Sequence, residues 1–374
     1  MKNNDDRLVS LDVARGFDML WITGLSKLVI VVCAAFGFGA ETALAAQMLH
    51  PEWAGLHFID FVFPTFIFIA GISFPYSLAK QRARDVPASR TILKIWKRAA
   101  VLVALGLVYN AILYKGPADT VWGSVLARIG LSWAAAATVA VLTPSVRLRL
   151  YLCASILAGY WALCLFVGAP DNPAAGNLTM EGCFAGWVDR VLLPGRLTHP
   201  GVISAQGVIS TVPAAVTAML GIFTGEYVRG SSACGERKSA VMLFVAAALA
   251  LAGLFVAYGF GQYSFPIIKK LWSTSYVLVS AGYSLALFAV CYFLIDVKGW
   301  WRNPVFFRVI GLNAITIYLV QTIVGVRQTK EILFKWVSTF FPAGWDAVVL
   351  QLGYIAICWA FLYFLHKRKI YLKV

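Results

Sequence analysis

The sequence predicts an all-α, polytopic membrane protein with about ten transmembrane helices. Of its 374 residues, 60% are hydrophobic and only 13% are charged, and the mean hydropathy is +0.76. A soluble core of this size does not need so much apolar surface. The apolar runs are long and continuous, without the two-residue alternation of a membrane β-strand, so the spanning elements are predicted to be helices.

The predicted spans cover the chain almost from end to end, with lengths that suit a hydrocarbon core about 30 Å thick. They are residues 16–36, 56–79, 99–114, 121–142, 150–168, 207–228, 239–258, 274–297, 304–325 and 346–365. The first run is long, has no small-residue cleavage site and follows a polar segment, so we expect no cleavable signal peptide. No repeat or soluble domain interrupts the pattern, and residues 1–374 are interpreted as a single transmembrane domain.

Basic residues predict the orientation, because cytoplasmic loops carry the excess of Lys and Arg. If the N-terminus is cytoplasmic, most of them fall on the inner side: Lys2, Arg7, Arg15, Lys80, Arg82, Arg84, Arg90, Lys94, Lys97, Arg98, Arg147, Arg149, Arg229, Arg237, Lys238, Lys298, Arg302, Arg308, Lys367, Arg368, Lys369 and Lys373. The outer side then holds Lys115, Arg190, Arg196, Lys269, Lys270, Arg327, Lys330 and Lys335. We therefore expect both termini in the cytoplasm and the chain in the cell's inner membrane.

The net charge and the cysteine pattern limit the kinds of binding partner and of site that the sequence predicts. The net charge of +15 follows this topology pattern, so it indicates attraction to anionic membrane lipid and no nucleic-acid partner. The seven cysteines form no CxxC pair, and most lie in apolar runs. Neither a metal site nor a disulfide framework is predicted.

Ionisable residues inside apolar runs are the first candidates for function, because they are costly in a membrane and usually face a cavity or a partner. His50 stands at the outer end of the second span, and Trp53, His57, Asp60 and Pro64 follow at helical spacing, so they are predicted to share one helix face. On an unbroken helix Asp60 would lie about 15 Å from His50. A direct bond between the two requires the intervening segment to fold back, and we expect Asp60 to hold Arg128 or another buried donor instead, with His57 as the nearer histidine.

Other spans contribute single polar residues. Arg128 lies in the fourth span and needs an anion, either a carboxylate such as Asp60 or a ligand phosphate. Glu226 lies near the inner end of the sixth span, and the ninth carries Asn313, Tyr318 and Gln321. A purely structural interpretation remains open, in which the histidine and tryptophan are interfacial anchors and Asp60 and Arg128 form a structural ion pair.

Five motifs in the same order resemble the heparan-α-glucosaminide N-acetyltransferase family of membrane acetyltransferases, including its bacterial NagX-like members. The motifs are "LVSLDVARG" with Asp12, Arg15 and Gly16; "HPEWAGLHFIDFVFP" with His50, Trp53, Gly55, Asp60, Phe63 and Pro64; "VLARIGLSW" around Arg128; "LWSTSYVL" with Trp272, Ser275 and Tyr276; and "IGLNAITIYLVQ" with Asn313 and Tyr318. Each is weak alone, but together they cover nearly the whole chain. One departure is Ser26, where many members have asparagine.

The resemblance implies transfer of an acetyl group from cytosolic acetyl-CoA to a glucosamine amine, free or at the end of a glycan, on the far side of the membrane. It makes His50 and Asp60 the catalytic candidates, with His50 as general base or as acetyl carrier. The substrate-binding candidates are Trp53, His57, Arg128, Trp272, Ser275, Tyr276, Asn313, Tyr318 and Gln321. The phosphates of acetyl-CoA are expected at the basic inner face, near Arg229, Lys298 and Arg302. No metal is implied, and relatives suggest a homodimer.

Three other function classes fit the same composition. A sugar or ion transporter also carries charges at mid-membrane, although its usual internal repeat is not evident here. A glycan O-acyltransferase would share the cytosolic donor and the external acceptor. A membrane scaffold without catalysis would bind no acetyl-CoA at all.

Overall fold

The computed structural model describes residues 8–39, 41–113, 120–301, 304–323 and 326–372, and this part of the chain is helical, with isolated β-bridges in its loops and no strand. Its main helices are α1 (Val9–Leu20), α2 (Ser26–Ala35), α3 (Ala43–Ala46), α4 (Val62–Arg82), α5 (Ala88–Leu113), α6 (Val125–Leu142), α7 (Val146–Phe166), α8 (Phe184–Leu192), α9 (Thr211–Gly230), α10 (Gly235–Tyr258), α11 (Thr274–Cys291), α12 (Val305–Leu312), α13 (Ala314–Ile323), α14 (Val326–Ser338) and α15 (Trp345–Lys367). The prediction of an all-α polytopic membrane protein is confirmed.

Eight helical segments within these residues are long and apolar enough to cross a membrane, or nine if a bent pair counts as one span. The bent pair is α12 and α13, which meet at 71° on either side of Asn313, so the predicted span 304–325 is broken. The predicted span 99–114 lies on α5, which is not among the eight and whose first half is the basic segment that includes Lys94 and Lys97. The described residues thus contain eight or nine candidate spans, beside the prediction of about ten.

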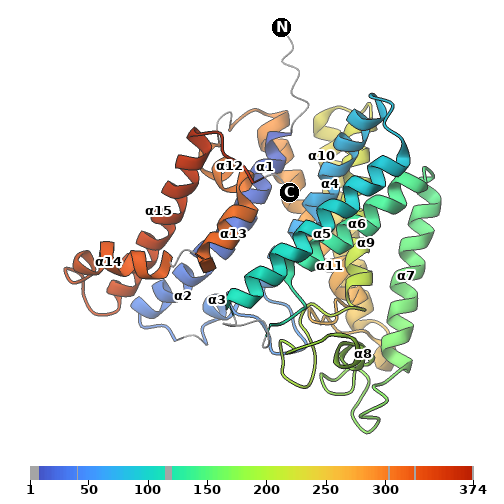
Figure 1. Cartoon of the computed structure of the whole chain (residues 1–374), viewed down its shortest axis with the longest axis horizontal. Helices are drawn as coiled ribbons and strands as arrows, with labels where there is room; N and C mark the ends of the chain where they lie inside the picture. Colours follow the sequence, from blue (N-terminus) through green and yellow to red (C-terminus); the bar gives the residue numbers. More distant parts are fainter. Residues whose placement is uncertain (1–7, 40, 114–119, 302–303, 324–325, 373–374) are drawn as a thin grey trace.

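Helix α4 lies at the centre of the bundle and packs against α1, α6, α9 and α11 (Figure 1). Its closest neighbour is α9, because glycines stand where the two backbones touch. A Cβ on Gly71 would lie 2.2 Å from the Ala218 carbonyl oxygen, and one on Gly221 would lie 2.0 Å from that of Phe68. Small residues at such crossings let membrane helices pack backbone against backbone. The first turn of α4, which follows Asp60, is thereby fixed within the bundle.

The bundle has two different ends. One end, which we call the basic end, carries the start of α1, the α4–α5 turn, the α9–α10 turn and the end of α15. The opposite end, called the α8 end, carries α8 and the long segment 167–210 (Figure 1). The described basic residues that were predicted to be cytoplasmic gather at the basic end. Four of the predicted inner residues lie outside the described residues, namely Lys2, Arg7, Arg302 and Lys373. Of the predicted outer group, Lys115 lies outside them too, and the Arg327 side chain is not described.

Candidate functional site

Residues 47–57, called the strap, fold back over the start of the second span. The Gln47 carbonyl accepts the Ile59 N–H at 3.1 Å, and the Gln47 side chain accepts the Phe58 N–H at 2.8 Å. The His57 ring nitrogen Nδ1 lies 2.6 Å from the Leu49 carbonyl oxygen. These bonds close the strap into a loop that brings its middle residues above the helix that follows.

A glycine fixes the far side of the strap. Gly55 has φ +138°, a conformation that side-chain-bearing residues rarely adopt, and its N–H donates to the Ile267 carbonyl at 2.9 Å. Trp53 adds a second tie, because its indole N–H donates to the Leu178 carbonyl at 2.7 Å. The strap is thus bound to two loops that lie far away in the sequence.

The predicted helix face through Trp53, His57, Asp60 and Pro64 is wrong. The strap is irregular up to His57, residues Phe58–Phe61 form a 3-10 turn, and α4 begins only at Val62. Since the chain folds back, His50 reaches Asp60 directly: its Nδ1 lies 2.7 Å from Asp60 Oδ1. The expectation that His50 and Asp60 do not bond to each other directly is wrong for the same reason.

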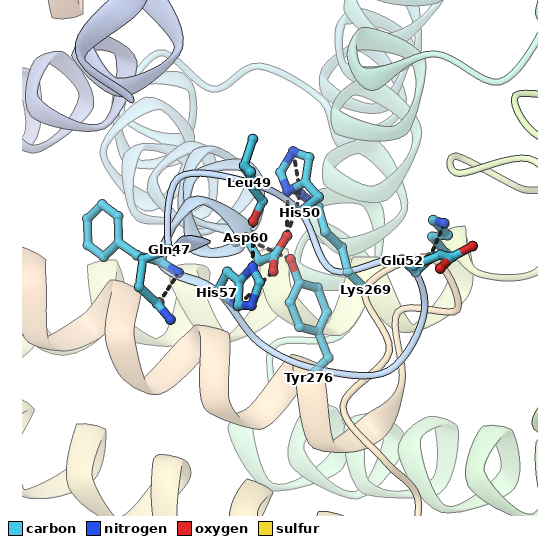
Figure 2. A network of polar contacts seen from close by, with 10 residues as sticks. Gln47, Leu49, His50, Glu52, His57, Asp60, Lys269 and Tyr276 are labelled. Carbon is cyan, nitrogen blue, oxygen red and sulfur yellow. Dashed lines mark hydrogen bonds and ion pairs between the residues drawn. The ribbon is translucent and has the colours of Figure 1, made fainter. Parts of the chain in front are cut away.

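Asp60 is 0% exposed and every carboxylate oxygen has a donor (Figure 2). Oδ1 accepts from His50 Nδ1 and, at 3.1 Å, from Lys269 Nζ, while Oδ2 accepts the His57 backbone N–H at 2.9 Å. The Asp60 carbonyl accepts the Tyr276 hydroxyl at 2.6 Å. Because a carboxylate only accepts, His50 carries its proton on Nδ1, which leaves the Nε2 lone pair available to a substrate.

Lys269 is a member of this cluster that sequence reasoning missed, since it counted the residue only as an outer basic one. Its side chain is 21% exposed, and burial lowers its pKa, an effect that the neighbouring Asp60 carboxylate opposes. The sequence does hold a signal, because Lys269 and Lys270 interrupt the apolar run from Phe265 to Trp272. Lys270 turns away from the cluster, toward the Glu52 carbonyl.

Arg128 does not pair with Asp60 as expected. Its guanidinium donates to the Gly207 carbonyl at 3.3 Å and to the Ser210 hydroxyl, and it lies over the Trp272 ring at 5.0 Å. It forms no ion pair with a carboxylate in the described part of the chain, and its Nε and Nη1 atoms are buried there without a hydrogen-bond partner. The Trp272 ring contacts the Tyr276 ring, with centroids 5.2 Å apart, and Tyr276 bonds to Asp60. Arg128 is thus linked to the Asp60 cluster through aromatic rings and not through an ion pair.

One cavity of about 610 Å³ begins at the His50 cluster and runs along α4 toward the basic end. His50, Lys269 and Gln206 line it at the α8 end, and Arg15, Ser73 and Arg98 line it at the other. Along α4, Ser73 lies about 20 Å from Asp60. The middle is apolar, formed by side chains such as Met19, Ile22, Ile59, Val62, Phe63, Phe66, Leu102, Leu126 and Ile129.

A second cavity of about 230 Å³ shares Ser73 and Arg98 with the first. It adds polar and basic side chains, namely Ser77, Gln81, Thr91 and Lys94. Arg98 also lies over the Trp133 ring at 4.5 Å, and its Nε is buried without a hydrogen-bond partner among the described residues. The basic end of the cavity system therefore presents donors suited to an anion.

The residues predicted to bind the phosphates of acetyl-CoA do not line either cavity in the described structure. Arg229 is in the last turn of α9, and Lys298 pairs with Glu236 at 2.5 Å; neither lines the two cavities. Arg302 lies outside the described residues. Glu226, also singled out from the sequence, forms a bidentate pair with Arg149, with both N–O distances 2.9 Å.

Apart from Trp53, His57 and Arg128, described above, the predicted substrate-binding residues divide into two groups. Tyr318 lines the large cavity, and Asn313 stands at the helix break between the lining residues Leu312 and Ala314. The Asn313 side chain is 2% exposed, and neither its amide oxygen nor its amide nitrogen has a partner in the described part of the chain, nor does the Gln321 nitrogen.

The second group is buried behind the cavity. Trp272 donates to the Thr217 hydroxyl at 3.2 Å, Ser275 donates to the Pro266 carbonyl at 3.0 Å, and Tyr276 holds Asp60. These side chains do not line the cavity. Tyr276 is linked to lining residues through Asp60, which bonds to His50 and Lys269.

Asp189 on α8 secures the loop that carries Gln206 into the cavity. Its buried carboxylate accepts the Ser204 N–H at 3.2 Å and the Val208 N–H at 2.9 Å. Burial raises the pKa of Asp189 to about 6, against the lowering effect of those bonds and of Arg128 and Arg190. The loop is therefore held by a group that titrates close to neutral pH.

Comparison with known proteins identifies one sequence family and distant relatives. Residues 7–113 match a sequence family described as "Domain of unknown function (DUF5009)". The chain is 25% identical over 420 residues to heparan-alpha-glucosaminide N-acetyltransferase of Homo sapiens and 24% identical over 425 residues to that of Mus musculus. The alignments cover 98% and 100% of this chain but 60% and 61% of the relatives. It is thus a distant relative of these acetyltransferases along its whole length, spanning about three fifths of theirs.

Proposed function

We propose that the protein transfers an acetyl group from acetyl-CoA across the membrane to the amine of glucosamine or of a terminal glucosamine residue, as a NagX-like bacterial member of the family it resembles. The observation that carries this proposal is the cavity. It joins the His50–Asp60 pair, in which the carboxylate is buried and the imidazole is exposed, to a cluster of basic side chains about 20 Å away at the other end. The distant relationship to N-acetyltransferases supports the same reaction.

At the α8 end, His50 is arranged to accept a proton. With Nδ1–H bound to Asp60, Nε2 takes one proton from the acceptor's ammonium group and passes it to solvent. The freed amine attacks the thioester carbonyl, and as the C–S bond breaks, the second amine proton goes to the departing thiolate of coenzyme A. In the alternative, the Nε2 lone pair attacks the thioester carbonyl and the C–S bond breaks to release the coenzyme A thiolate. The neutral amine then takes the acetyl group from Nε2, and the proton that it loses balances the thiolate as coenzyme A thiol. Both routes require a neutral imidazole.

At the basic end, Arg15, Lys94 and Arg98 supply positive charge for the phosphates of acetyl-CoA. The apolar middle of the cavity then encloses the pantetheine arm, with the thioester toward His50. Asn313, whose side-chain amide has no partner among the described residues, and Tyr318 are the candidates to contact the arm. This assignment replaces Arg229 and Lys298 by residues that line the cavity.

The orientation follows from the charges. With the basic end in the cytoplasm, both termini are cytoplasmic, the donor enters from the cytosol and the acceptor meets His50 on the external side of the inner membrane. Labelling of single cysteines placed in the α4–α5 turn tests this directly. A turn that is labelled from outside intact cells contradicts the orientation.

The experiment that tests the reaction uses the purified full chain, acetyl-labelled acetyl-CoA and a panel of amino sugars. We expect label on the nitrogen of glucosamine-type acceptors and none on the corresponding hydroxy sugar. Label on oxygen instead supports the O-acyltransferase alternative. Failure to bind acetyl-CoA at all supports the transporter or the scaffold.

A further inference from the structure

Lys269 stands against both members of the His50–Asp60 pair (Figure 2). Its Nζ lies 3.1 Å from Asp60 Oδ1, 3.2 Å from His50 Nδ1 and 3.5 Å from His50 Nε2. Since Nδ1 already donates its proton to Asp60, that atom has no lone pair for the ammonium. The ammonium therefore has only the Nε2 lone pair to donate to on the ring, at the long distance of 3.5 Å, and its shorter contact, with Asp60, is the ion pair.

The position of Lys269 is set by its backbone. The Trp272 N–H donates to the Lys269 carbonyl at 3.0 Å. The neighbouring Ile268 N–H donates to the Ser273 hydroxyl at 3.0 Å, and the Ile268 carbonyl accepts the Ser273 N–H at 3.2 Å. Ile268 and Leu271 are 1% and 0% exposed, so the loop is anchored on both sides of the lysine. The anchored loop thus holds the Lys269 ammonium beside His50 and Asp60.

The charges around the imidazole decide its protonation. Asp60 alone would favour the doubly protonated ring, whereas a second cation beside the ring disfavours it. Among the described residues, the other charged or titratable groups near the cluster are Tyr276, whose hydroxyl donates to the Asp60 carbonyl, Arg128, which acts on Lys269, and Lys270, Glu52 and His57. With Lys269 in place, the Asp60 charge is already balanced by an ammonium.

We propose that Lys269 is a positioning residue for acetyl transfer: bonded to Asp60, it keeps the carboxylate ionised and keeps the His50 imidazole in the neutral, Nδ1–H form whose Nε2 can act on the substrate. This role rests on the proposed function of His50. It applies to both routes, because general-base catalysis and acetyl carriage each need the Nε2 lone pair.

The test compares the pH dependence of acetyl transfer in Lys269→Met, Lys269→Arg and wild type. Two unit charges a few ångströms apart near a protein surface interact strongly enough to move a titration by one pH unit or more. We expect the acid limb of kcat in Lys269→Met to move up by about one pH unit, which is about a tenfold loss below the limb, with most activity returning at higher pH. Lys269→Arg should keep the wild-type limb.

Lys270→Met is the matched control, because it removes the neighbouring positive charge from a side chain that points away from His50. Its acid limb should stay in place. An equal loss at every pH in Lys269→Met, or a limb that does not move, overturns the proposal and leaves a structural role for the lysine.

A second readout does not need the reaction. In protein with ¹³C-labelled histidine, the His50 signal, assigned by its absence in His50→Gln, should titrate at higher pH in Lys269→Met than in wild type. If wild type transfers no acetyl group, the proposed function fails, but this titration still decides the role of Lys269. An unchanged His50 titration overturns it.

Discussion

The two ends of the cavity are built on opposite principles. At the α8 end every polar atom of the Asp60 carboxylate is satisfied by the protein itself, from His50, Lys269 and the His57 backbone. At the basic end, Arg98 is half-buried yet keeps an Nε without a hydrogen-bond partner among the described residues, and the charged groups there are predominantly positive. One end is preorganised before any ligand arrives, and the other carries charge that a ligand would complete.

This difference has a physical reason. A group that performs a proton transfer must hold its geometry during the reaction, so its partners are internal and fixed. A group that binds an anionic ligand gains most if the ligand supplies the missing acceptors, because a buried donor without a partner is costly. Substitutions at the two ends should therefore change different kinetic constants.

The largest effect is expected for His50→Ala. Acetyl transfer should fall by a factor of about 10² or more, as removal of a general base typically causes. Binding of acetyl-CoA should persist, because the side chains proposed to bind its phosphates lie at the opposite end of the cavity. Measurement of kcat and of acetyl-CoA affinity for the purified variant checks both statements.

His57→Ala is the comparison for this substitution, since its ring contacts the Leu49 carbonyl and does not line the cavity. It should lose less activity than His50→Ala. If His50 is the acetyl carrier, labelled acetyl remains on wild-type protein without acceptor and is absent from His50→Ala. Near-normal turnover in His50→Ala would refute the assignment of the site.

An intermediate effect is expected for Arg98→Gln. It removes a charge that lines both cavities, and hydrogen bonds to charged groups contribute roughly 1.5–3 kcal/mol. The KM for acetyl-CoA should rise about tenfold or more, while the KM for the amino sugar stays within about twofold. Steady-state kinetics with each substrate varied in turn measures the split.

Two controls sharpen this prediction. Lys97→Gln removes the adjacent but exposed charge, and Arg229→Gln removes the charge favoured by the sequence alone. Both should leave the KM for acetyl-CoA near its wild-type value. A larger change in Arg229→Gln than in Arg98→Gln would place the donor outside the cavity.

The smallest effect concerns Asp189, which ties the Gln206 loop to α8. Its pKa is raised from 3.8 to about 6 by burial, so between these pH values the folded chain binds more protons than the unfolded chain. The free energy of unfolding from this group therefore falls as the pH rises from about 4 to about 6. Asp189→Asn should remove that part of the dependence.

Thermal unfolding of detergent-solubilised protein at pH 5 and pH 7.5 checks it. The melting temperature of wild type should drop by a few degrees more than that of Asp189→Asn over this interval. Equal drops in the two proteins would show that another group dominates.

The sequence by itself determined the class and the basic architecture of this protein. Long apolar runs can only be spanning helices where backbone groups have no water to bind, so the all-α polytopic fold could be read directly. The residues most out of place in those runs, His50 and Asp60, were also found, because a polar group next to lipid is costly enough to stand out in a linear pattern. Asn313 stood out for the same reason, although the bend that it marks did not.

Only the tertiary structure decided how these residues meet. The His50–Asp60 contact depends on the strap, which is closed by backbone bonds from Gln47 and Gly55 to partners that no periodicity reveals. Lys269 is separated from Asp60 by 209 positions and joins it through the packing of two loops. The choice of Arg15 and Arg98 over Arg229 followed from which basic side chains line a cavity, a property of packed helices and not of charge along the chain. Local sequence encodes helix and burial, whereas the site is made of long-range contacts that exist only once the bundle has closed.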